Sequence, residues 1–130
     1  MVNDQLRRQL IESAVAVREQ AHAPYSGFKV GAALIAEEGA IFSGCNIENS
    51  SLGLTICAER VAIGAAISAG AKKFQAICVV SKKGASPCGA CRQFISEFGD
   101  DIIILVVDAD GNEVKKEIKL KELLPDSFSL

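Results

Sequence analysis

Helical periodicity in the sequence predicts three helices. Apolar residues three or four positions apart predict an amphipathic helix that Asp4 caps and that runs to about Gln20. An alanine-rich segment predicts a second helix over residues 57–69, which the following glycine would end. A third helix is expected over residues 88–98, because a proline precedes it and a glycine follows it.

Strand-like patterns occupy most of the other apolar segments. Residues 29–36 and 40–46 flank a Glu-Gly turn and are expected to form a hairpin. Residues 74–81 and 102–107 are apolar without alternation, which is typical of strands buried on both faces, and apolar positions alternate over residues 114–120. Helices that alternate with apolar strands predict a layered α/β domain, and the opening hairpin makes its sheet mixed rather than fully parallel.

The composition indicates a globular protein. The chain has 130 residues, of which 49% are hydrophobic and 23% are charged. This length supports a single domain over residues 1–130, with a core that needs no disulfides. The net charge of −2 gives no basic field for a nucleic acid, so a polynucleotide partner is not expected. The apolar runs are much shorter than the ~18 residues of a membrane span, so no membrane partner is expected either.

The cysteines indicate a reducing environment. Five cysteines are an odd number, and residues 1–4 lack the basic and then apolar start of a secretory signal. Cysteines in a reducing compartment bind metals or lie buried rather than forming disulfides. We therefore expect a cytoplasmic protein, some of whose cysteines are metal ligands.

Three of the cysteines stand in two short motifs with a carboxylate beside them. Cys57 and Glu59 belong to a Cys-Ala-Glu tripeptide, and Cys88 and Cys91 belong to a Pro-Cys-Gly-Ala-Cys pentapeptide. Both motifs fall at expected helix starts, where backbone N–H groups and the helix dipole favour thiolates. Three sulfur ligands leave a tetrahedral zinc one position for a water, which is typical of catalytic sites. Glu59 is poorly placed to bind the same ion, but it can move protons to and from that water.

Each of these residues also has a simpler interpretation. A Cys-x-x-Cys pair alone is a redox pair or half of a structural zinc site, which Cys45, Cys78 or His22 would have to complete. In that zinc-stabilised structural or binding module, Glu59 is a solvated glutamate at a helix start and Arg60 a surface residue. In the catalytic interpretation, burial beside thiolates raises the pKa of Glu59, and Arg60 hydrogen-bonds the sulfurs and withdraws charge.

Several motifs in a fixed order give the chain a family resemblance. They are Pro24-Tyr25-Ser26, Phe28 with Val30-Gly31-Ala32-Ala33-Leu34, Gly44-Cys45-Asn46-Ile47-Glu48-Asn49, Cys57-Ala58-Glu59-Arg60, Ser86-Pro87-Cys88-Gly89-Ala90-Cys91-Arg92-Gln93 and Leu123-Leu124-Pro125. The whole chain resembles the small homotetrameric cytidine deaminases, and the cysteine motifs match a zinc-deaminase signature in its all-cysteine form. One departure is the segment from Ser81 to Ala85, which is shorter than the usual loop before the second cysteine motif. This difference affects only the shape that is expected for the rim of the pocket.

The resemblance implies a fold, a reaction and a cofactor. Family members are three-layer α/β/α domains around a five-stranded mixed sheet. They are zinc-dependent enzymes of pyrimidine salvage that deaminate cytidine and 2′-deoxycytidine to the uridine forms. Mapped onto this chain, Cys57, Cys88 and Cys91 would hold one Zn²⁺, and Glu59 would be the catalytic proton shuttle.

For the substrate, the resemblance implies that Asn46 and Glu48 take a sugar hydroxyl and that Phe28 packs on the base. An amide and a carboxylate suit a hydroxyl, which both donates and accepts. The simpler interpretation makes Asn46 and Glu48 turn residues and Phe28 a core residue. No arginine flanks residues 46–51, which favours a nucleoside over a nucleotide. Another aminated pyrimidine, a nucleoside analogue or a nucleic-acid cytosine is the alternative substrate for the same chemistry.

The resemblance also implies a homotetramer, in which Phe128 of one chain closes the pocket of a neighbour. The alanine-rich helix with Gly64 offers a surface of small residues that a neighbouring backbone can approach closely. The same surface is equally suited to pack on the sheet of its own chain.

Overall fold

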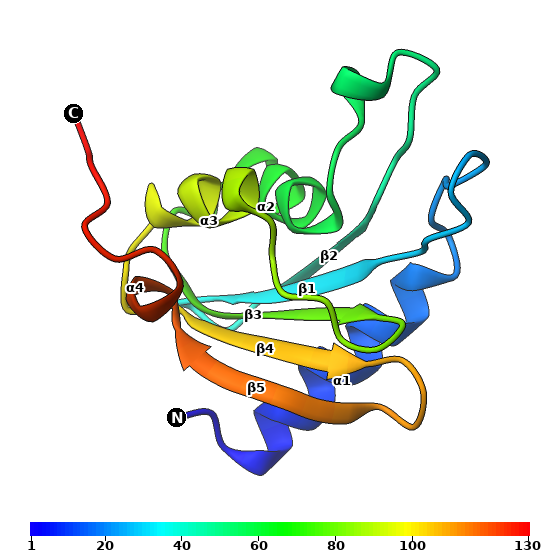
Figure 1. Cartoon of the computed structure of the whole chain (residues 1–130). Helices are drawn as coiled ribbons and strands as arrows, with labels where there is room; N and C mark the ends of the chain where they lie inside the picture. The colour runs from blue at the N-terminus through cyan, green and yellow to red at the C-terminus, as the bar shows by residue number, and fades with distance from the viewer.

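The computed structural model describes residues 1–130 as a five-stranded mixed sheet with helices on both faces (Figure 1). The elements in chain order are α1 (Asp4–Arg18), β1 (Gly31–Ala36), β2 (Ile41–Cys45), the 3₁₀ helix η1 (Leu52–Leu54), α2 (Ala58–Ser68), β3 (Phe74–Ser81), α3 (Gly89–Ser96), β4 (Ile103–Asp108), β5 (Glu113–Lys119) and α4 (Leu120–Leu123). The strand order is β2-β1-β3-β4-β5. Only β3 and β4 are parallel, so the expected mixed sheet and three-layer α/β/α architecture are confirmed.

The sheet divides the core into two layers. Within β1, Ala32, Leu34 and Ala36 face the layer of α2 and α3, whereas Ala33 and Ile35 face α1. All six residues of β1 are buried, as are seven of the eight residues of β3. A central strand covered on both faces needs apolar residues at every position, which explains the absence of alternation in the sequence.

The N-cap of the first helix lies one residue earlier than expected. The side chain of Asn3 accepts a hydrogen bond from the Leu6 backbone N–H at 2.8 Å, so Asn3 is the N-cap. Asp4, which the sequence pattern made the cap, is the first helical residue and forms an ion pair with Arg7. The correction is local, because a carboxylate in the first turn also interacts favourably with the helix dipole.

Two short helices lie where the sequence pattern predicted none. The expected loop between β2 and α2 contains η1 and projects from the body of the molecule (Figure 1). The alternating C-terminal tail forms β5 as far as Lys119 and then turns into α4, which packs beside α3. None of the helices combines the length and the apolar character required to cross a membrane.

Two glycines let the helices approach the sheet closely. A β-carbon on Gly31 of β1 would lie 2.0 Å from the backbone oxygen of Ala14 in α1. A β-carbon on Gly44 of β2 would lie 2.4 Å from the backbone nitrogen of Ala62 in α2. Backbone atoms cannot move aside as a flexible side chain can, so both helices are seated at positions that only glycine permits.

We expect Gly31→Ala to lower the free energy of unfolding by about 2 kcal/mol or more, because the added methyl group overpacks the contact between α1 and β1. Urea unfolding measures the change. Gly53→Ala is the matched control, since its added carbon meets nothing within 4 Å. Equal stability of the two variants would contradict the expectation.

Candidate active site

The three cysteines of the two motifs lie at the first turns of α2 and α3. Cys57 is the N-cap of α2, and Cys88 is the N-cap of α3, with its Sγ accepting a hydrogen bond from the Cys91 backbone N–H at 3.4 Å. Cys91 follows within the first turn of α3. Both helices therefore direct their unpaired N–H groups and positive dipole ends at the sulfurs, which favours thiolates there.

The three sulfurs lie close enough to share one ion. The Sγ atoms of Cys57 and Cys88 are 3.9 Å apart, and all three sulfurs lie within 4.8 Å of one another. Zinc–sulfur bonds of about 2.3 Å in a tetrahedron place sulfurs roughly 3.8 Å apart. The donor set and the spacing of Cys57, Cys88 and Cys91 suit one zinc ion.

The residues considered as a fourth ligand lie elsewhere. Cys78 is fully buried in β3 and belongs to the core layer against α1, on the opposite face of the sheet. Cys45 at the end of β2 and His22 in the loop after α1 are not part of the sulfur cluster. A closed site of four protein ligands, which a structural module requires, is therefore not what this chain forms.

Negative charge is shared unevenly among the sulfurs. The Cys91 thiol, with help from Arg60 and Cys88, lowers the pKa of Cys57 to about 5. The pairing with Cys57, together with burial, raises the pKa of Cys91. Cys57 thus ionises before Cys91. A divalent cation is what allows neighbouring sulfurs to be thiolates together.

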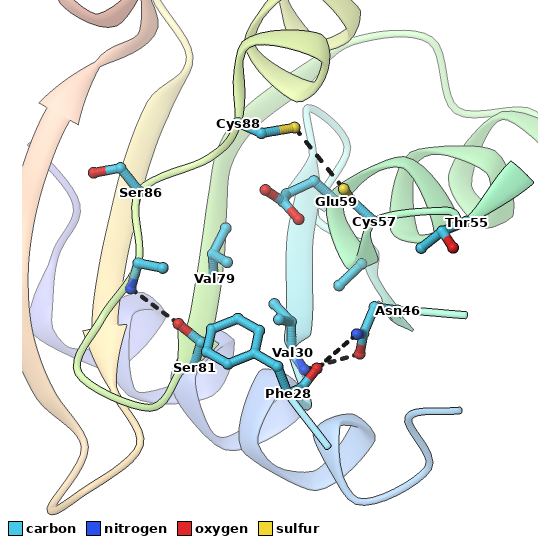
Figure 2. A pocket seen from close by; sticks show the side chains of 12 residues that line it. Phe28, Val30, Asn46, Thr55, Cys57, Glu59, Val79, Ser81, Ser86 and Cys88 are labelled. Carbon is cyan, nitrogen blue, oxygen red and sulfur yellow. Dashed lines mark hydrogen bonds between the residues drawn. The ribbon is translucent and has the colours of Figure 1, made fainter. Parts of the chain in front are cut away.

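Glu59 is a buried carboxylate beside this cluster. Its side chain, only 4% exposed, points from the first turn of α2 into the space that Cys57 and Cys88 border (Figure 2). Burial, reinforced by the Cys57 thiolate, raises the pKa of Glu59 above its ordinary value. A carboxyl group with a raised pKa can both accept and return a proton near neutral pH.

Cys57, Cys88 and Glu59 border one cavity of about 190 Å³ (Figure 2), whereas Cys91 is buried and does not line it. Its lining residues are Phe28, Val30, Asn46, Thr55, Cys57, Ala58, Glu59, Val79, Ser81, Ala85, Ser86 and Cys88. The structure thus brings Phe28 and Asn46 together with both metal motifs, although Phe28 and Cys88 are 60 residues apart in the sequence. A mostly apolar cavity with a few convergent polar groups is the usual form of a small-molecule site.

Asn46 fixes the backbone that carries Phe28. Its Nδ2 donates to the Phe28 carbonyl at 2.8 Å, and its Oδ1 accepts from the Val30 N–H at 2.9 Å (Figure 2). Each amide atom keeps one further hydrogen-bonding position. Asn46 therefore orients the wall of the cavity and still has capacity for a ligand.

Comparison with known proteins identifies the family. A family model described as the cytidine and deoxycytidylate deaminase zinc-binding region matches residues 4–107. The chain is also similar to a cytidine deaminase of Sporosarcina psychrophila, with 46% identity over 122 residues that cover 92% of this chain and 89% of the relative. The chain belongs to the cytidine deaminase family.

Structural similarity agrees with the sequence. A crystal structure of the cytidine deaminase from Burkholderia pseudomallei has a TM-score of 0.88 and 46% identity to this chain, and covers 93% of this chain and 98% of that one. A cytidine deaminase of Halalkalibacterium halodurans is 44% identical over 95% of this chain and 94% of the relative. The family and the fold that the motifs implied are confirmed.

Arg60 of this cytidine deaminase homologue lies against the first sulfur. Its Nη2 donates to Cys57 Sγ at 3.7 Å and to the Thr55 carbonyl at 3.5 Å. Its Nε is buried without a hydrogen-bond partner. Contact with Cys57 is the principal reason that the pKa of Arg60 is raised, so the guanidinium keeps its charge beside the sulfurs.

Two predicted substrate residues lie outside the cavity of their own chain. Phe128 is 71% exposed and borders a separate polar hollow together with residues 96–100. Glu48 does not line the cavity. Seven other lining residues were given no role from sequence. Val30, Ala58 and Ser86 stand in the family motifs, and Ser81 and Ala85 bound the short loop that was expected at the pocket rim. Only Thr55 and Val79 carried no signal.

Glu48 instead clamps the loop that carries Phe28. Its Oε1 accepts hydrogen bonds from the backbone N–H groups of Tyr25 at 3.0 Å and Ser26 at 3.2 Å. The Ser26 hydroxyl donates to Oε2 of Glu48 and accepts from the Phe28 N–H. The Ser26 hydroxyl is the main cause of the lowered pKa of Glu48, because these donors stabilise its charged form.

We expect Glu48→Gln to lower the free energy of unfolding at pH 7, and the difference from wild type to disappear in acid. The folded pKa lies below the ordinary 4.5, so the contribution of Glu48 is complete above that pH and is lost as pH falls through the lowered value. Urea unfolding at a series of pH values measures the difference. Glu12→Gln, at an exposed position of α1, is the control. A difference that persists unchanged in strong acid would show that the charge of Glu48 is not its source.

Proposed function

We propose that this chain, acting as one catalytic domain over residues 1–130, hydrolyses cytidine and 2′-deoxycytidine to uridine and 2′-deoxyuridine with release of ammonia. The observation that carries the proposal is a cluster of three sulfurs, two of which border a small cavity together with one buried carboxylate. Membership of the cytidine deaminase family supports the same reaction.

The cavity supports a free nucleoside as the substrate. Neither lysine nor arginine is among its lining residues, so it offers no side chain that would clamp a phosphate. Its volume of about 190 Å³ is below the roughly 300–1,000 Å³ of drug-sized pockets, which suits a small substrate. The net charge of −2 provides no general attraction for a nucleic acid.

Cys57, Cys88 and Cys91 would hold the zinc, which when bound supplies Lewis acidity that makes a water more acidic. Glu59 would accept a proton from the water while the water oxygen bonds to C4 of the cytosine ring, and would deliver that proton to N3. It would then move the second proton of the same oxygen to the amino group, which leaves as ammonia. In the uridine product, the water oxygen is the C4 carbonyl oxygen and the first water proton remains on N3.

The substrate would lie along the wall that Phe28 and Asn46 form. The aromatic ring of Phe28 suits a face of the base, and the unused hydrogen-bonding positions of Asn46 suit a sugar hydroxyl. Glu48 would reach the sugar by a shift of its carboxylate, and otherwise supports the site through the Phe28 loop. Arg60 would withdraw charge from the sulfurs, which counters the electron donation of three thiolates.

Glu59→Gln is expected to retain zinc and to lose at least about a hundredfold in turnover, because a positioned acid–base group contributes ~10²–10⁴-fold. Loss of the cytidine absorbance band measures turnover, and elemental analysis of the same sample measures zinc. The control is Glu38→Gln in the exposed turn after β1. Turnover near that of wild type in Glu59→Gln would exclude Glu59 as the proton shuttle.

Exposed apolar side chains support association of several chains. Leu52 and Leu54 on the projecting η1 segment are 71% and 66% exposed. Ile56, just before α2, and Ile67, near its end, are also exposed. Such residues gathered on neighbouring segments are typical of a protein interface. We propose a homotetramer in which Phe128 of one chain completes the cavity of a neighbour.

Subunit mixing tests this assembly. Phe128→Ala is expected to raise KM for cytidine about tenfold, as an aromatic contact of roughly 1–1.5 kcal/mol predicts. Phe128→Ala chains refolded together with inactive Glu59→Gln chains should show a KM closer to that of wild type. The inactive chains would supply Phe128 to sites that have an intact Glu59. Mixing with the double variant Glu59→Gln/Phe128→Ala is the control and should restore nothing. A monomeric mass in light scattering would contradict the tetramer.

A further inference from the structure

The second cysteine motif is held by a residue that sequence analysis did not assign. Arg92, in the first turns of α3, donates from Nε to the carbonyl of Pro87 at 2.8 Å. Pro87 is fully buried and directly precedes Cys88. Its carbonyl and the nitrogen of Cys88 belong to one rigid peptide plane, so fixing the carbonyl fixes the direction in which the chain enters Cys88.

The same guanidinium also reaches the C-terminal segment. Its Nη1 donates to the carbonyl of Leu123 in α4 at 2.9 Å. Leu123 is partly buried and packs against the core layer of α2 and α3. Arg92 therefore ties two backbone segments, one before a metal ligand and one near the end of the chain, into a single unit.

The first motif has a related arrangement, which shows what differs at Arg92. Arg60 also donates to a backbone carbonyl just before its N-cap cysteine, that of Thr55, but at 3.5 Å, and it touches the sulfur of Cys57 as well. Both hydrogen bonds of Arg92 go to backbone carbonyls and none goes to a sulfur. Arg92 can thus act on the site only through the position of the backbone.

We propose that Arg92 is a positioning residue of the metal site, which holds the Pro87–Cys88 peptide against the C-terminal helix α4. The zinc ligand Cys88 then depends on the end of the chain for its placement, although the two lie more than thirty residues apart. The inference rests on the zinc site of the proposed function, but its test needs no turnover.

The expected consequence is faster metal release. Without Arg92, the Pro87 and Leu123 carbonyls lose their donors and Cys88 loses its fixed entry. Partners that orient metal ligands typically change metal affinity by about 10–100-fold when they are replaced. Zinc bound to Arg92→Gln should therefore leave about tenfold faster than zinc bound to wild type.

The experiment follows zinc passing from the loaded full-length protein to the chromogenic chelator 4-(2-pyridylazo)resorcinol. Arg92→Gln is compared with Arg8→Gln, which replaces an exposed arginine of α1. Arg92→Lys serves as a milder variant that keeps the charge but loses the planar fork with two donors. Circular dichroism confirms that each variant is folded before release is measured.

A second pair of variants tests the link to α4. Leu123→Ala loosens the packing of α4, so it should speed zinc release from protein that keeps Arg92. The same change should add little in protein that already carries Arg92→Gln, because both substitutions break the same link between Arg92 and α4. Leu130→Ala, at the exposed last residue, is the control and should release zinc at the wild-type rate.

Three outcomes would overturn the proposal. The first is that folded Arg92→Gln releases zinc at the wild-type rate. The second is that Leu123→Ala speeds zinc release equally with Arg92 present and with Arg92→Gln. The third is that Leu130→Ala also speeds zinc release. If Arg92→Gln does not fold, release from Arg92→Lys at the wild-type rate overturns it in the same way. Wild-type protein that binds no zinc would contradict the proposed function, which separates that failure from a failure of the role of Arg92.

Discussion

Three cysteine sulfurs can share one cation only if the first turns of two helices meet, and this meeting determines the arrangement of the chain. The N-termini of α2 and α3 lie on the same face of the sheet, and their sulfurs lie within 4.8 Å of one another. Helix dipoles and unpaired N–H groups stabilise charge at this point, and one zinc ion neutralises the mutual repulsion of the thiolates. The close seating of α2 on the sheet at Gly44 contributes to this placement.

The same geometry places the carboxylate that we propose as the proton shuttle. Glu59 is two residues from Cys57, so the first turn of α2 that presents the sulfur also directs the carboxylate into the cavity. Burial then raises its pKa, which a proton carrier near neutral pH requires. One helix start therefore supplies both a metal ligand and an acid–base group, and no separate loop has to be ordered for the second.

The two loops beside the cavity, which carry Phe28 and Pro87, are held by side chains that hydrogen-bond to backbone groups. Asn46 and the pair of Glu48 and Ser26 hold the loop of Phe28 through its N–H and carbonyl groups. Arg92 does the same for the chain before Cys88. Loops without regular structure are mobile unless their backbone groups are satisfied, so these hydrogen bonds restrain the walls of the cavity.

The sequence by itself determined the features that depend on short-range physics. Strand β3 was predicted with its observed bounds, and both cysteine motifs were placed at helix starts, because unbroken apolar runs, Pro87 and Gly99 act locally. Spacing within single turns paired Cys57 with Glu59 and Cys88 with Cys91, and the family motif joined the two pairs into one site. The cap of α1 is a local error of the sequence pattern, because the neighbouring Asn3 takes the place of Asp4. Only the tertiary structure decided that Asn46 lines the cavity while Glu48 does not, and that Arg92 meets Leu123. These outcomes depend on which distant segments the sheet brings together, and no periodicity in the chain encodes that contact.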